Sequence, residues 1–99
     1  MYYREVNGKP VPATLEEFVA VYKMDRRVNR TAIGDVEVST VFLGLDHAHD
    51  DGPPVLYETM IFGGKHDNDM WRYHTREEAE AGHAKVVAAV QAGKVEDLD

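Results

Sequence analysis

The chain has 99 residues, of which 43% are hydrophobic and 29% are charged, a composition typical of one globular domain with a modest core. It contains no cysteine, which excludes a disulfide framework, a thiolate metal site and a cysteine nucleophile. No apolar run reaches the ~20 residues that span a bilayer, and the start MYYREVNGKP lacks a signal-peptide core, so we expect a cytoplasmic protein without membrane contact. The formal net charge of -7 argues against direct nucleic-acid binding and suits a basic partner.

Residues 1–13 predict an N-terminal β segment. Asn7-Gly8 is a strong signal for a two-residue hairpin turn. Pro10 and Pro12 weaken the second arm, because proline has no amide to donate to a strand ladder. Both an edge hairpin and a single short strand therefore remain open for this segment.

A first helix is predicted from Thr14 to about Met24. Thr14 and Glu17 match a capping box, in which the hydroxyl and the carboxylate each accept a free amide of the first turn. Apolar residues follow on one face at helical spacing. They are Leu15, Phe18, Val19 and Tyr22.

Four antiparallel strands are predicted in the middle of the chain, at residues 27–33, 36–45, 55–62 and 70–74. The two long central runs are rich in β-branched and aromatic residues, which suit a pleated, half-buried surface. Polar segments with glycine and proline separate them, and the pair Gly63-Gly64 ends the third strand.

A second helix is predicted from Thr75 to about Ala92, since Thr75 and Glu78 form another capping box and Gly93 is a natural stop. Its apolar face consists of Ala79, His83, Val86, Val87 and Val90. We expect residues 94–99 to form a frayed acidic tail. The fold class is therefore α+β: a single two-layer domain over residues 1–99, with an antiparallel sheet of about four strands and two amphipathic helices.

The segment Asp46–Asp51 holds two histidines among aspartates, which are suitable ligands for zinc, manganese or nickel. The last predicted strand runs back toward this segment, so a metal site within one chain would use His47, His49 and His74. A solvated polar loop explains the same residues, because no motif with a full set of ligand spacings is present. We expect no cofactor.

Five other residues are candidates for binding. Glu58 lies on a largely apolar face, where it either pairs with Arg72 of the next strand or anchors a ligand. Trp71 and Tyr73 share a face and are either core under a helix or an exposed platform. His83 faces the sheet, and we expect it to be buried and hydrogen-bonded to a group such as Tyr57 or the carboxylate of Glu58.

Gly82 stands in the middle of the second predicted helix, where glycine costs about 1 kcal/mol relative to alanine. Such a residue is reasonable where a bulky ring approaches the helix closely. The sequence offers Trp71 and Tyr57 as that ring.

Three segments, VSTVFLGLDH (38–47), ETMIFGG (58–64) and WRYHTREEAEAGHAKVV (71–87), resemble a family of small uncharacterised proteins of bacteriophages and bacteria. The resemblance covers nearly the whole chain and includes the turn Asn7-Gly8-Lys9-Pro10 before a helix. It implies a phage or prophage accessory protein, and it transfers no functional residue, because the family carries no assigned activity.

These observations leave three hypotheses open. The leading one is a non-enzymatic protein that binds a host or phage protein without covalent chemistry. The second is a module that sequesters a nucleotide or metabolite in a pocket lined by Glu58, Arg72, Tyr73 and His83. The third is a metal-dependent hydrolase that uses the histidine-rich segment. A homo-oligomer is also compatible with the sequence, because an open sheet has edges that a second copy could cover.

Overall fold

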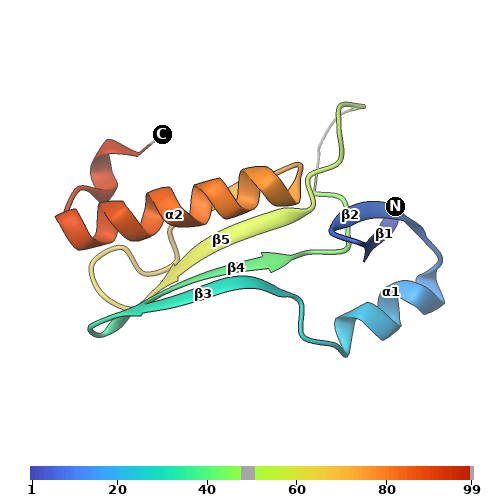
Figure 1. Cartoon of the computed structure of the whole chain (residues 1–99), viewed down its shortest axis with the longest axis horizontal. Helices are drawn as coiled ribbons and strands as arrows, with labels where there is room; N and C mark the ends of the chain where they lie inside the picture. The colour runs from blue at the N-terminus through green and yellow to red at the C-terminus, as the bar shows by residue number, and fades with distance from the viewer. Residues whose placement is uncertain (48–50, 99) are drawn as a thin grey trace.

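The computed structural model describes residues 1–47 and 51–98, and in them two antiparallel sheets and two α-helices alternate along the chain (Figure 1). The predicted α+β class with a four-stranded antiparallel sheet is confirmed. The elements are β1 (Tyr2–Val6), β2 (Lys9–Ala13), α1 (Leu15–Tyr22), β3 (Arg27–Ile33), β4 (Val36–Phe42), β5 (Tyr57–Phe62), β6 (Met70–Tyr73), α2 (Arg76–Ala92) and the short 3-10 helix η1 (Val95–Asp97).

The larger sheet has the strand order β3-β4-β5-β6, with each strand antiparallel to its neighbour. Side chains alternate between its two faces, as the period of a strand requires. The face with Val38, Thr40 and Phe42 of β4 is buried beneath α2, which contacts all four strands. The opposite face carries Ser39, Val41 and other partly exposed residues. The sheet therefore presents one covered face and one open face.

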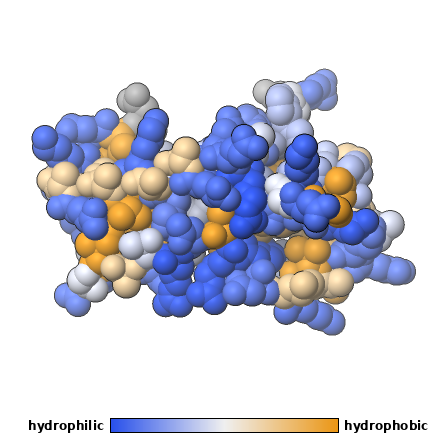
Figure 2. Space-filling model, viewed as in Figure 1, coloured by the Kyte–Doolittle hydropathy of each residue, from blue (hydrophilic) through white to orange (hydrophobic). Residues whose placement is uncertain are grey.

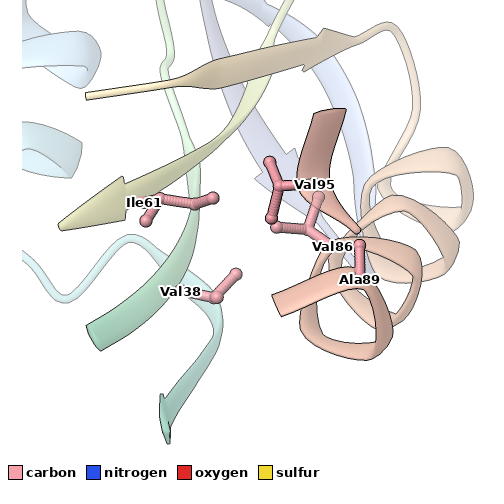
Figure 3. Packing of buried hydrophobic residues seen from close by; sticks show 5 residues of the cluster. All are labelled: Val38, Ile61, Val86, Ala89 and Val95. Carbon is pink, nitrogen blue, oxygen red and sulfur yellow. The ribbon is translucent and has the colours of Figure 1, made fainter. Parts of the chain in front are cut away.

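The core lies between this sheet and α2 (Figure 3). Val38 and Ile61 of the sheet pack against Val86 and Ala89 of α2. Val95 of η1 belongs to the same buried cluster. The sequence predicts a frayed tail from residue 94 onward. That prediction is wrong for residues 94–98, because Val95 is buried and η1 forms there. The reason is that one apolar residue after Gly93 reaches uncovered core, a contact that the acidic composition of the tail conceals.

The second sheet is the hairpin β1–β2, so the hairpin alternative is the one realised. Asn7 and Gly8 both have positive φ values, 52° and 77°, as a tight two-residue turn requires. The hairpin extends the end of β4, since the amide of Tyr3 donates to the carbonyl of Gly44 over 2.7 Å and Tyr2 forms an isolated bridge with Leu45.

The helix α1 lies apart from the two main layers and packs against the hairpin (Figure 1). Its capping box is present, but none of its residues is buried. Leu15 and Tyr22 are each 56% exposed, although both belong to the predicted apolar face. The expectation that two amphipathic helices cover the sheet therefore holds for α2 alone, because the hairpin offers α1 only a narrow surface.

Several predicted boundaries differ by a few residues. α1 ends at Tyr22, β4 ends at Phe42, and β5 begins at Tyr57. Strand β4 is shorter than predicted because Gly44 adopts a φ of 75°, which turns the backbone out of the extended conformation. A Cβ atom at Gly44 would lie 3.1 Å from the ring of Phe18, which is closer than ordinary packing. This turn brings the hairpin and α1 against the end of the sheet.

Gly82 of α2 faces the phenol ring of Tyr73, and a Cβ atom at this position would overlap that ring. The expectation of a ring against Gly82 is therefore confirmed, but the ring is neither Trp71 nor Tyr57. The glycine thus allows α2 to approach the edge strand β6.

We predict that Gly82→Ala destabilises the protein by about 1 kcal/mol, because an overlap cost of about 1–3 kcal/mol exceeds the propensity gain of about 1 kcal/mol. In a Tyr73→Leu background the overlapping ring atoms are gone, and the same substitution should stabilise the protein. Urea unfolding of the four proteins measures both effects. An equal effect of Gly82→Ala in the two backgrounds would contradict the packing argument.

Candidate functional site

The pleat of the sheet separates the five predicted binding residues into two groups. Glu58 pairs in register with Arg72, so both lie on the open face. Trp71 and Tyr73 alternate with Arg72 and lie on the face covered by α2, where His83 also points. The pocket predicted from Glu58, Arg72, Tyr73 and His83 therefore does not form around one cavity, because the sheet stands between its members.

The predicted ion pair between Glu58 and Arg72 is present. The guanidinium Nε of Arg72 donates to Oε2 of Glu58 over 3.0 Å. A second pair on the same face joins Arg30 of β3 to Glu37 of β4. Each carboxylate on this face is thus neutralised by an arginine of the adjacent strand.

His83 is buried, with 2% of its surface exposed, as predicted. Its hydrogen-bond partners differ from the prediction. Thr40 Oγ1 lies 2.7 Å from Nδ1, and Thr31 Oγ1 lies 2.9 Å from Nε2. Tyr57 and Glu58 are not its partners, since the hydroxyl of Tyr57 donates to Glu5 over 2.6 Å and Glu58 pairs with Arg72.

The contacts of His83 continue into a chain of hydroxyl groups across the whole sheet. Thr40 and Thr59 place their hydroxyl oxygens 2.5 Å apart, and Thr59 is hydrogen-bonded to Tyr73. The chain therefore joins α2 to β3, β4, β5 and β6. Neutral imidazole has one donor and one acceptor nitrogen, and a threonine hydroxyl can both donate and accept. The two threonines beside His83 can therefore satisfy both of its ring nitrogens.

Burial shifts the pKa of two members of this chain, His83 and Tyr73. It lowers the pKa of His83, because the imidazolium loses its hydration beneath α2. It raises the pKa of Tyr73, and the hydrogen bond from Thr59 opposes this shift. The neutral forms are favoured, which is typical of a polar network that specifies packing.

Glu5 is a partly buried residue that the sequence did not single out. Its carboxylate accepts from the guanidinium of Arg76 at 3.1 and 3.2 Å and from the hydroxyl of Tyr57. Burial raises the pKa of Tyr57, and the neighbouring carboxylate of Glu5 adds to the shift. This cluster ties the hairpin to the start of α2. A lone glutamate in an edge strand carries no sequence signal that would have revealed it.

A cleft of about 600 Å³ opens between the edge strand β6 and one flank of α2. Trp71 and Tyr73 form its sheet side, and η1 closes one end with Asp97 and Leu98. Its helix side is a stripe at positions i, i+3, i+4 and i+7, namely Glu78, Ala81, Gly82 and Lys85. Trp71 and Tyr73 thus pack against the core, as one of the two alternatives predicted, and they also border the cleft.

A shallow groove of about 690 Å³ runs over the open face of the sheet and along α1. Apolar side chains from four separate segments make most of its surface. They include Phe18 and Tyr22 of α1, Val41, Leu43 and Leu45 at the end of β4, Met60 of β5 and Met70 of β6. Its polar members are Arg26, His47, Glu58 and Arg72.

Of the predicted metal ligands, His49 lies outside the described residues. His47 borders the open-face groove, and Nδ1 of His74 lies 3.0 Å from the carbonyl of Pro54. Within residues 1–47 and 51–98, no group of three or more histidine and acidic side chains is placed to hold a metal ion. His47 and His74 are therefore not joined by a third ligand in this part of the chain.

No helix in the described part of the chain is both long and apolar enough to cross a membrane. Comparison with protein-family models, with curated proteins and with solved structures finds no match to this chain. Three features of the described residues bear on function: the open-face groove, the cleft beside β6 and the buried chain through His83.

The lowered pKa of His83 makes stability depend on pH. The unfolded chain protonates near the ordinary histidine pKa of about 6.5, whereas the folded chain resists protonation until a lower pH. We expect the contribution of His83 to the free energy of unfolding to be complete above pH 7 and to decrease as pH falls below about 6.5. This fall should shrink in His83→Gln and persist in His74→Gln, a control at an exposed histidine. Urea unfolding at several pH values tests it; equal slopes in wild type and His83→Gln would contradict it.

Proposed function

We propose that this protein acts by non-covalent binding of a host or phage protein, and that the open-face groove and α1 form the binding surface. The observation that carries the proposal is the apolar surface left exposed there. On α1, Val19 is 42% exposed and Leu15 and Tyr22 are more so; in the groove, Leu45 is 38% and Met70 is 47% exposed. Contiguous exposed apolar surface of this kind is typical of a protein interaction site.

Figure 2 shows hydrophobic residues that reach the surface in the region of α1, at the lower right of the view. Other hydrophobic patches lie at the left end of the same view. Tyr22 adds an aromatic side chain whose ring carries the guanidinium of Arg26 at 4.0 Å. Tyrosine, arginine and methionine are enriched at the centres of protein interfaces.

The charge of the chain and of its open face indicates which kind of protein could bind there. The chain carries a formal net charge of -7, but the ion pairs Arg30–Glu37 and Arg72–Glu58 leave the open face locally balanced. A second copy would bring two chains of -7 together, and their mutual repulsion opposes association. We therefore favour a different protein that presents an apolar patch within a neutral or basic surface.

The resemblance to small bacteriophage and bacterial proteins supports an accessory role in a bacterial cytoplasm. The acidic chain and the apolar groove give no support to nucleic-acid binding, which relies on lysine and arginine along the surface. The metabolite alternative loses support because the four residues predicted to line one pocket lie on two faces of the sheet. The metal-dependent hydrolase has no supporting arrangement within the described residues.

The test places a photo-crosslinking amino acid at position 70 and identifies the protein captured in bacterial cells. We then expect the purified partner to bind Met70→Glu and Tyr22→Glu about tenfold or more weakly than wild type, because each substitution puts a charge into an apolar contact. Both side chains are exposed, so the variants should fold normally. Titration calorimetry measures the affinities.

Ala84→Glu is the matched control, since it adds the same charge on an exposed position of α2 away from the groove. Its affinity should stay within about twofold of wild type. Crosslinking of the chain to itself would replace the proposal with a homodimer. If the captured partner binds Met70→Glu and Tyr22→Glu as tightly as it binds wild type, this surface is ruled out as the binding site.

A further inference from the structure

Strand β6 is an edge of the larger sheet, because it pairs with β5 and no other strand follows it in the sheet order of the described residues. The carbonyl of Tyr73 accepts from Leu56, and that of Asp69 accepts from Ile61, each over 3.0 Å. Main-chain groups alternate in direction along a strand. Those of Met70 and Arg72 therefore point away from β5, toward the outside of the sheet.

The cleft between β6 and α2 lies beside this edge. Strands of a sheet stand about 4.8 Å apart, and an added strand would place alternate side chains beneath the flank of α2. The small residues Ala81 and Gly82 leave space beside α2, and Trp71 gives the cleft an apolar surface. The space of about 600 Å³ is enough for large side chains. A fifth strand would thus complete both the hydrogen bonding of the edge and the packing of the half-buried Trp71.

The other edge of the sheet is protected in a way that β6 is not. Strand β3 has a register irregularity between Arg27 and Asn29, and Arg30 adds a second charged side chain along it. Bulges and charges of this kind discourage the pairing of a further strand. In β6 the single charged side chain, Arg72, is held on the open face by Glu58. The two edges therefore differ in their readiness to accept a strand.

We propose that the cleft beside β6 binds an extended peptide segment of another protein, which adds to the sheet as a fifth strand and inserts a large apolar side chain between Trp71 and the Ala81–Gly82 flank. This mode is strand addition, in which main-chain hydrogen bonds supply affinity and alternate side-chain pockets supply selectivity. It uses a surface distinct from the open-face groove, so it stands independently of the function proposed above.

Charge defines the peptide further. The cleft lining contains two acidic side chains, Glu78 of α2 and Asp97 of η1, and the whole chain carries a formal net charge of -7. Glu78 is occupied in the helix cap, where amide hydrogen bonds from His74 and Thr75 lower its pKa. Lys85 makes no ion pair within the described residues and is the one cation of the lining. The preferred segment is therefore apolar at its centre and basic at its flanks, with Lys85 able to meet a peptide carbonyl.

The experiment selects a displayed library of random twelve-residue peptides against the wild-type protein. Enriched peptides should carry an aromatic or branched residue with lysine or arginine nearby. The most enriched one is labelled with fluorescein, and its affinity is measured by anisotropy. We expect Ala81→Trp to weaken binding at least tenfold, because the indole fills the cleft, and the matched exposed control Ala84→Trp to stay within twofold.

Two further measurements separate strand addition from a simple hydrophobic contact. Methylation of alternate peptide amides should abolish binding in one of the two alternating sets and spare it in the other. In hydrogen exchange, the amides of Met70 and Arg72 should become protected at least tenfold on peptide binding, while that of Trp71 changes little. No enriched peptide, equal affinity of wild type and Ala81→Trp, or equal effects of the two methylation sets would each overturn the proposal.

Discussion

The buried chain of hydrogen bonds through His83 is the constraint on which the rest of the structure depends. Apolar contacts alone allow a helix to slide over a sheet, whereas buried polar groups must meet their partners or lose several kcal/mol of hydration. His83 has Thr31 on one side and Thr40 on the other, and Thr40 is hydrogen-bonded in turn to Thr59 of β5. One position of α2 satisfies all of these groups together.

That position determines which surfaces remain open. With His83 held between β3 and β4, the flank of α2 near β6 stands over Tyr73 and leaves Trp71 half-covered. In the same arrangement α2, the single long helix of the described residues, covers one face of the sheet. The side chains on the opposite face therefore remain partly exposed. The cleft and the open-face groove are therefore consequences of how one helix is anchored.

The two open surfaces differ in chemistry, which is why we propose a different kind of partner for each. The groove along α1 is wide, apolar and balanced in charge, which suits a folded partner. The cleft beside β6 combines the outward-pointing main-chain groups of an edge strand with a partly apolar space whose acidic lining residues are Glu78 and Asp97, which suits an extended basic peptide.

The sequence by itself determined the elements and their faces, because helix and strand periods and capping boxes act over a few residues. It therefore predicted four antiparallel strands, the burial of His83 and the ion pair between Glu58 and Arg72, which needs only the alternation of adjacent strands. Tertiary structure alone decided that His83 meets Thr31, which is 52 residues away, that α1 leaves the sheet uncovered, and that Val95 returns to the core. Periodicity shows which way a side chain points, but what lies opposite depends on the register and docking of distant segments.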